Sequence, residues 1–160
     1  MAKSKEEKTN VMRTLEQKKI PYTAHSYDPE GPIDGVSVAQ TLGQPPEQVF
    51  KTLVTKGASG AYYVFDIPVA ENLDLKKAAK AVGEKSVAML PQKELLPLTG
   101  YVHGGCSPVG MKKQFPTVFH ETALLCGTVC VSAGKIGHQV ECDPNALIAL
   151  LRAKTADVIV

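Results

Sequence analysis

The stretch VFKTLVTKGASGAYYVFDI, residues 49–67, carries the strongest structural signal in the chain. Two segments rich in β-branched and aromatic residues, 49–56 and 61–67, flank the tetrapeptide GASG at 57–60. Such side chains favour strands, and a short segment with glycine between two runs of them favours a hairpin. We therefore predict a β-hairpin over residues 49–67.

Shorter elements are predicted on both sides of this hairpin from hydrophobic spacing, capping residues and turn residues. One helix is predicted after a cap at Thr9 or Asn10, ending before Pro21. Further helices are predicted over residues 37–43, with Ser37 as N-cap, and over 74–82, 91–96 and 145–152. Strands are predicted over 22–27, 87–90, 117–120, 128–132 and 139–142, with an edge strand over 157–160. This mixture predicts an α/β or α+β domain around a mixed, curved sheet.

The composition is that of one compact domain. The chain has 160 residues, 44% of them hydrophobic and 21% charged, which excludes intrinsic disorder. No apolar run approaches the roughly 20 residues of a membrane-spanning helix. The charged N-terminus MAKSKEEKTN has no apolar core behind it, so it is not a secretory signal. We expect a single domain over residues 1–160 in the cytoplasm, with residues 1–8 as a loose tail; the oligomeric state stays open.

The net charge of +2 is too small to imply a coat for nucleic acid. Its distribution is uneven, because residues 95–120 contain two lysines and two histidines but no acidic residue. A local basic surface and ordinary solvated lysines are both compatible with this pattern.

The four cysteines are Cys106, Cys126, Cys130 and Cys142, and their spacing is not that of a secreted disulfide scaffold. Reduced cytosolic thiols are therefore expected. A zinc site from Cys126 and Cys130 is not expected, since positions four apart in one strand lie about 13 Å from each other.

Lys51 stands in a strand whose two faces both look apolar. Alternation places Val49 and Leu53 on the same face as this lysine, and Phe50 and Val54 on the other. A lysine there costs free energy unless its ammonium group reaches a partner or a cleft. Two interpretations stay open: Lys51 binds an anion such as a phosphate or a carboxylate, or its side chain reaches solvent at the sheet edge.

The loop GGCSPVG, residues 104–110, is the second candidate feature. Glycines let a backbone approach a ligand, and successive N–H groups can form an anion-binding nest. The loop matches neither a P-loop nor a dinucleotide-binding motif, and a plain turn explains it equally well. Cys106 invites a role as nucleophile, but no histidine at a recognisable spacing pairs with it.

Four segments occur together in a recognisable order: FKTL at 50–53, LDLKKA at 73–78, TGYVHGGCSPVGMKK at 99–113 and VSAGK at 131–135. With these segments the chain closely resembles the YbaK-type Cys-tRNA(Pro) deacylases. They are free-standing relatives of the editing domain of bacterial prolyl-tRNA synthetases. The resemblance extends over nearly the whole chain and implies a mixed, barrel-like β-sheet surrounded by short helices.

The resemblance also implies a function, the removal of cysteine wrongly attached to tRNA(Pro). Editing at a second site is needed because a small pocket discriminates weakly between amino acids of similar size. The lysine of the family corresponds to Lys51, which would hold the phosphate of the terminal nucleotide or orient the ester. The other residues implied to form the pocket are Tyr27, Thr52, Gly104, Gly105, Cys106, Ser107, Pro108 and Ser132.

The family mechanism is substrate-assisted: the cysteinyl thiol attacks its own ester carbonyl, and the protein positions the ester. Lys51 and the backbone N–H groups of Gly105 and Ser107 are the implied catalytic groups, the latter as oxyanion donors. No metal or organic cofactor is implied. The implied partners are the acceptor end of aminoacyl-tRNA and prolyl-tRNA synthetase.

Two positions depart from the family pattern. Cys106 stands where relatives have an aliphatic residue, and Gln139 stands where they have aspartate, which leaves the role of Gln139 open.

Two other functions remain as alternatives. One is a deacylase of the same fold for another amino acid, such as alanine; the other is a non-catalytic module that binds tRNA ends or the synthetase.

Overall fold

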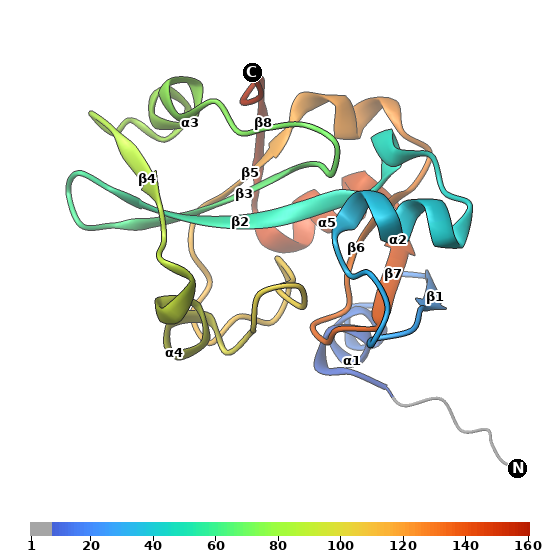
Figure 1. Ribbon diagram of the computed structural model, residues 1–160. Helices are drawn as coiled ribbons and strands as arrows, with labels where there is room; N and C mark the ends of the chain where they lie inside the picture. Colours follow the sequence, from blue (N-terminus) through green and yellow to red (C-terminus); the bar gives the residue numbers. More distant parts are fainter. Residues whose placement is uncertain (1–7) are drawn as a thin grey trace, which may run out of the picture.

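The predicted hairpin forms the middle of the larger of two sheets in the computed structural model, which describes residues 8–160 (Figure 1). β2 (Phe50–Gly57) and β3 (Tyr62–Pro68) pair in antiparallel register. Gly60 has a φ of 94° in the turn between them, a region that favours glycine. The hairpin prediction is confirmed. The predicted tail over residues 1–8 lies, apart from Lys8, outside the described residues.

Three short strands complete the larger sheet, in the order β4-β2-β3-β5-β8. They are β4 (Val87–Met89), β5 (Thr117–His120) and β8 (Lys154–Ala156). β4 runs antiparallel to β2, whereas β5 and β8 add on the other side in parallel. β4 pairs only with residues 55–57 of β2, so among the described residues 51–53 have no strand partner on that side. Residues 51–53 at this free edge border the pocket described below.

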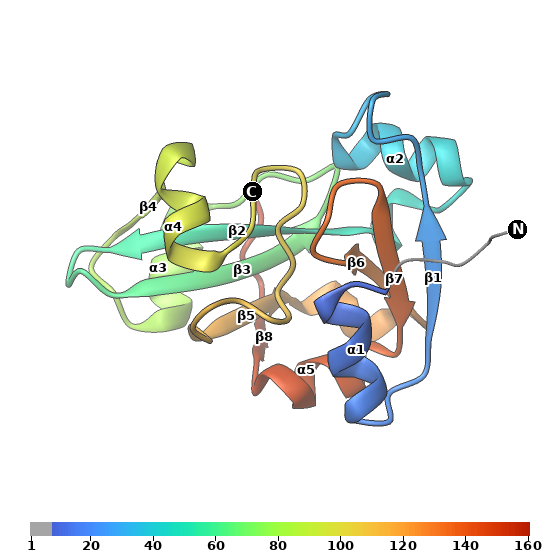
Figure 2. The ribbon, with the colours of Figure 1, turned by 90° about the horizontal axis from the view of Figure 1, so that it is seen from below.

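The remaining strands form a second sheet in the order β1-β7-β6 (Figure 2). They are β1 (Tyr22–Ser26), β6 (Val129–Ser132) and β7 (His138–Cys142). A single-residue bridge between Val49 and Cys130 links the two sheets. The 3₁₀ helix η1 (Pro46–Gln48) directly precedes Val49 and prevents a longer strand there. The mixed α/β class is confirmed, but a single barrel-like sheet is not.

The helices begin where short polar side chains accept hydrogen bonds from free backbone N–H groups. Thr9, Asp74 and Asp143 cap α1 (Asn10–Gln17), α3 (Leu75–Val82) and α5 (Pro144–Leu151). The predicted cap at Ser37 is wrong. Asp34 accepts a hydrogen bond from the Ser37 N–H at 3.1 Å, so α2 (Gly35–Leu42) begins two residues earlier.

Two other predicted boundaries also differ. The helix predicted over 91–96 is a 3₁₀ turn, η2 (Gln92–Glu94), followed by α4 (Leu95–Thr99). The edge strand predicted over 157–160 is wrong, and β8 lies at 154–156 instead. The reason is that β5 ends at His120, which pairs with Ala156, so no further β5 residue is left for pairing. Ile159 makes only an isolated bridge to Leu73.

The apolar core occupies both faces of the larger sheet. Helix α3 covers one face, where Phe65 and Ile67 pack with Ala78 and Ala79 (Figure 1). The other face carries the even-numbered residues of β2 and β3 and packs in the larger cluster, which includes Cys106. Within residues 8–160, no helix is long and apolar enough to cross a membrane.

Candidate active site

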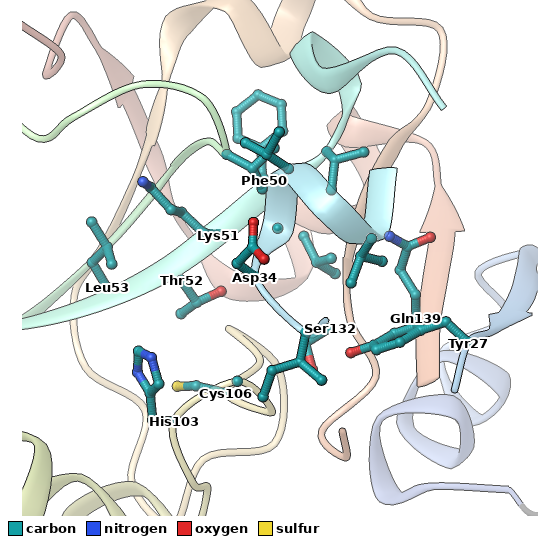
Figure 3. A pocket seen from close by; sticks show the side chains of 18 of the residues that line it. Tyr27, Asp34, Phe50, Lys51, Thr52, Leu53, His103, Cys106, Ser132 and Gln139 are labelled. Carbon is teal, nitrogen blue, oxygen red and sulfur yellow. The ribbon is translucent and has the colours of Figure 1, made fainter. Parts of the chain in front are cut away.

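A pocket with a volume of about 320 Å³ lies beside the free edge of β2 (Figure 3). Its walls come from β2, from α2 and the residues before it, from the start of the glycine-rich loop and from the β6–β7 hairpin. Most of the lining is apolar. The side chains that bring polar groups to it are Tyr27, Asp34, Lys51, Thr52, His103, Ser132, His138 and Gln139. A cavity of this size, apolar with a few polar groups, is typical of a small-ligand site.

Lys51 and Thr52 leave β2 on opposite sides of the strand, and both border this pocket (Figure 3). The free edge of β2 makes this arrangement possible, because no neighbouring strand separates its two faces there. The Lys51 side chain is half-buried. Its burial lowers the pKa of the ammonium group, while the charge of Glu71 acts in the opposite direction. Lys51 thus stands at a free sheet edge and also borders the pocket, so anion binding by this lysine stays a prediction.

Thr52 is held from behind by a buried carboxyl group. Its Oγ1 lies 2.5 Å from Oδ1 of Asp66, which stands directly opposite in β3. Asp66 has no exposed surface. Burial raises the pKa of Asp66 to about 8, and the hydrogen bond from Thr52 only partly opposes this effect. The pocket thus contains a hydroxyl group whose partner is a buried, neutral acid near pH 7.

The glycine-rich loop contributes Gly104 and Cys106 to the lining, whereas Gly105, Ser107 and Pro108 are buried behind it. Glycine is favoured at both positions, at Gly104 by a φ of 89° and at Gly105 by close packing against backbone. A Cβ on Gly104 would lie 2.9 Å from Cδ1 of Ile33, and one on Gly105 would lie 3.1 Å from the backbone N of Ile136. The loop therefore packs tightly against the β6–β7 hairpin that forms the next wall.

The backbone N–H groups of this loop are only partly available. The Gly105 N–H donates to the Val102 carbonyl at 3.0 Å. To act as an oxyanion donor, it would have to share this hydrogen bond with the ligand or break it. The Ser107 Oγ accepts from the Val109 N–H at 3.3 Å, which fixes this side chain within the loop. Oxyanion donation by the backbone N–H groups of Gly105 and Ser107 stays a prediction. For Gly105 it also costs the free energy of the hydrogen bond to Val102.

Cys106 faces the pocket as a thiol. Its residue is only 9% exposed. Burial, and after it the nearby Asp66 carboxyl, raise the pKa of this thiol to about 12. A reactive cysteine needs a lowered pKa, because the thiolate is the nucleophile. The spacing in the sequence indicated no histidine partner, whereas the structure places His103 at the same pocket beside Cys106 (Figure 3). The raised pKa of the thiol is the observation that argues against Cys106 as a nucleophile.

Tyr27 and Ser132 both reach the pocket, from the end of β1 and the end of β6. The Tyr27 N–H donates to the Gly137 carbonyl at 2.9 Å, and Ser132 Oγ accepts from the Gly134 N–H at 3.1 Å. These bonds fix the β6–β7 turn against the chain that follows β1. Six of the nine predicted site residues therefore line one pocket: Tyr27, Lys51, Thr52, Gly104, Cys106 and Ser132.

Gln139, whose role the sequence left open, has a structural partner. Its side-chain amide forms two hydrogen bonds with that of Gln44, at 2.7 and 3.1 Å. Gln139 is 4% exposed, so this reciprocal pair satisfies a buried amide. It ties β7 to the chain that follows α2.

The sequence analysis missed three residues that line the pocket, Asp34, His103 and His138, and also Asp66 behind it. Asp34 borders the pocket while it caps α2, and hydrogen bonds from Ser37 lower its pKa. Its signal was present, because an aspartate three residues before a serine is a normal cap spacing. Asp66 was also visible, as an acid inside an otherwise apolar strand. His103 had no local signal.

The cysteines are free thiols in different parts of the fold. Cys126 follows the 3₁₀ helix η3 (Glu121–Leu125), so the expectation that it shares a strand with Cys130 is wrong. Among the described residues, no three His, Cys, Asp or Glu side chains group in a way that could hold a metal ion.

Comparisons with known proteins identify the family of this chain. The family described as "Aminoacyl-tRNA editing domain" matches residues 34–150. A protein of Enterococcus faecalis named "Putative Cys-tRNA(Pro)/Cys-tRNA(Cys) deacylase EbsC" is 47% identical over 99% of this chain and 98% of its own length.

Solved structures of similar proteins have the same fold as this chain. A crystal structure of "a putative trans-editing enzyme for prolyl tRNA synthetase" is 28% identical, with a TM-score of 0.81 over 94% of each chain. The hypothetical protein APE2540, 23% identical, superimposes with a TM-score of 0.86 over 94% of this chain and 99% of its own. The family match covers most of the chain, including the pocket residues from Asp34 to Gln139. The chain therefore belongs to the aminoacyl-tRNA editing domain family, as the sequence resemblance implied.

Proposed function

We propose that this protein is a trans-editing aminoacyl-tRNA deacylase that removes mischarged cysteine from tRNA(Pro), with the pocket beside β2 as its editing site. The observation that carries the proposal is that a cation and a hydroxyl group, Lys51 and Thr52, border a small apolar pocket whose thiol, Cys106, is protonated. Such a site can hold and polarise an ester but brings no activated protein nucleophile to it. The close relative is named for deacylation of Cys-tRNA(Pro) and Cys-tRNA(Cys).

In the proposed reaction the substrate supplies the nucleophile. The cysteinyl sulfur forms a bond to its own ester carbonyl carbon, the bond from that carbon to the terminal ribose oxygen breaks, and the thiol proton ends on the ribose oxygen. The product is a cyclic thiolactone, which water opens to free cysteine. The protein positions the ester and stabilises the developing oxyanion, effects worth several kcal/mol in related chemistry. Lys51 and backbone amides of residues 104–107 have these roles in the proposal.

A time course of ester loss tests the proposal. tRNA(Pro) charged separately with cysteine, alanine and proline is incubated with the protein, and the remaining aminoacyl-tRNA is measured. We expect rapid loss of cysteine and retention of proline. Faster loss of alanine would support a deacylase of the same fold with another amino acid. Retention of all three would leave only a module that binds tRNA ends or the synthetase.

Replacing Cys106 by serine is expected to preserve most of the deacylase activity. The substrate thiol attacks in the proposed reaction, and the protein thiol is held neutral by burial. The measurement is the single-turnover rate on Cys-tRNA(Pro), with Cys130→Ser as a control for the loss of a buried thiol away from the pocket. A covalent cysteinyl adduct on Cys106, trapped and identified by mass spectrometry, would contradict the expectation.

The isolated protein is expected to deacylate Cys-tRNA(Pro) and Cys-tRNA(Cys) at similar rates. A pocket of about 320 Å³ has room for the aminoacyl end, which the two substrates share. Selection of tRNA(Pro) then comes from a transient complex with prolyl-tRNA synthetase in the cytoplasm, which we propose as the partner. Rates are compared with and without the synthetase. A strong preference for tRNA(Pro) in its absence would disprove this part of the proposal.

A further inference from the structure

Asp66 is the one buried acid behind the pocket wall, and half of its carboxyl group has no partner among the described residues. Its Oδ1 accepts from Thr52 Oγ1 at 2.5 Å, while Oδ2 is buried without a hydrogen bond. The neighbours on the same face of β2 and β3 are apolar, namely Phe50, Val54 and Val64. Burial of a carboxylate without full hydrogen bonding is strongly unfavourable, so such a group takes up a proton instead.

The proton on Asp66 changes what Thr52 can do. A carboxylate only accepts hydrogen bonds, so Thr52 must donate its hydroxyl proton to it and then offers only lone pairs to the pocket. A neutral carboxylic acid can donate to Thr52 Oγ1, and the Thr52 O–H is then free to point into the pocket. Since Thr52 lines the pocket, the two forms of the acid present opposite polarity to a ligand.

We propose that Asp66 is a positioning residue whose proton makes the Thr52 hydroxyl a hydrogen-bond donor to the carbonyl oxygen of the bound ester. The inference rests on the proposed function, because it names the ester as the group that Thr52 addresses. In this scheme the enzyme is active with Asp66 protonated and loses this donor as Asp66 ionises. The expected midpoint is near pH 8, where burial places the pKa of Asp66.

The surroundings of Asp66 contain few other groups that titrate. Across the sheet, Thr52 of β2 and Phe119 of β5 stand opposite it, and neither carries a charge. From the covering loop, Cys106 is the titratable group near the carboxyl, and it stays a thiol at the pH values used. Lys51 leaves β2 on the other side, and His103 borders the pocket beside Cys106 (Figure 3). Lys51 and His103 are unchanged when Asp66 is replaced, so they do not distinguish an Asp66 variant from the wild type.

The test is the pH dependence of a ratio of rates. Asp66→Asn keeps the shape of the side chain and can donate to Thr52 at every pH. The measured quantity is its kcat/KM for Cys-tRNA(Pro) divided by that of the wild type. This ratio cancels the titration of the substrate thiol and of every protein group that the two proteins share. We expect a ratio near one at pH 6.5 and about 10 at pH 9, because one acid group with a pKa near 8 is then about nine-tenths ionised. Circular dichroism at each pH verifies that both proteins are folded.

Thr52 variants provide the matched controls. In a Thr52→Val background the same ratio should be flat with pH, whereas Thr52→Ser should restore its rise. A ratio that is flat in the presence of Thr52 would overturn the inference, since a purely structural Asp66 would not make the ratio depend on pH.

A binding measurement separates this inference from the proposed function. The probe is a stable amide analogue of the substrate end, cysteine joined to 3′-amino-3′-deoxyadenosine, which keeps the carbonyl acceptor but is not cleaved. Wild-type affinity for the probe should fall about tenfold between pH 7 and 9, while that of Asp66→Asn stays constant. This result supports the inference even if no Cys-tRNA is deacylated. Parallel pH profiles of the two proteins would overturn it, whether or not deacylation occurs.

Discussion

Replacing Lys51 by alanine is expected to lower deacylation of Cys-tRNA(Pro) by at least about 100-fold. This is the size of effect seen when one oriented donor is removed from an oxyanion-type site. Lys51 stands at the free edge of β2 and borders the pocket, and burial lowers the pKa of its ammonium group. Loss of the ammonium group removes the only lysine or arginine among the pocket-lining residues. The proposal assigns this cation to the phosphate of the terminal nucleotide or to the ester.

The fold should survive this substitution. The Lys51 side chain is half-exposed, and alanine removes a partly buried charge from the strand without leaving an unpaired group in the core. Lys56→Ala is the matched control, because Lys56 lies in the same strand, is exposed and borders no part of the pocket. Single-turnover rates and circular dichroism are measured for both variants. Wild-type turnover of Lys51→Ala would remove this lysine from the mechanism.

Serine in place of cysteine on tRNA(Pro) is expected to be removed far more slowly. The two aminoacyl groups differ in one atom, oxygen for sulfur, so they fit the pocket almost equally. A thiol is a few per cent thiolate near pH 7 and is a strong nucleophile, whereas a hydroxyl group is not. Attack by the substrate side chain therefore predicts rapid loss of cysteine and slow loss of serine. Attack by water, guided by Lys51, predicts similar rates for both.

The first product distinguishes the same two mechanisms. Substrate-assisted cyclisation releases a thiolactone before free cysteine, which rapid quenching and mass spectrometry detect. Direct hydrolysis releases free cysteine from the start. Proline on tRNA(Pro) serves as the control for spontaneous ester loss. Comparable rates for serine and cysteine would rule out the substrate-assisted reaction while leaving the protein a deacylase.

Much of the fold was predictable because its signals are local. The hairpin over residues 49–67 follows from strand formers on both sides of a turn with glycine. Gly43 and Gly83 end α2 and α3 in left-handed conformations, and glycine directly after a helical segment is a local signal for such an end. Asp34 shows the limit of such signals. Asp34 and Ser37 are both acceptable caps, and only the observed hydrogen bond distinguishes them.

Part of the site was predictable in the same way. A lysine in an apolar strand indicated a special position for Lys51, and the family motifs indicated Thr52, the glycine-rich loop and Ser132. The sequence could not tell that Gly105 donates its N–H within the loop, because that bond depends on the path of the chain at Val102. It also could not tell that Gln139 is paired with Gln44, a residue 95 positions away.

The sequence by itself determined most of the strands, several helix ends and the residue types at the pocket, because these depend on neighbours a few positions apart. Only the tertiary structure decided how the strands divide into two sheets and which side chains meet across them. β4 pairs only with residues 55–57 at the end of β2 and leaves the rest of that side as an edge, so Lys51 and Thr52 border one pocket from opposite faces. The register of β2 and β3 places Asp66 behind Thr52. Register and sheet order depend on pairing between distant segments, and a buried acid acquires its raised pKa only when that pairing excludes water.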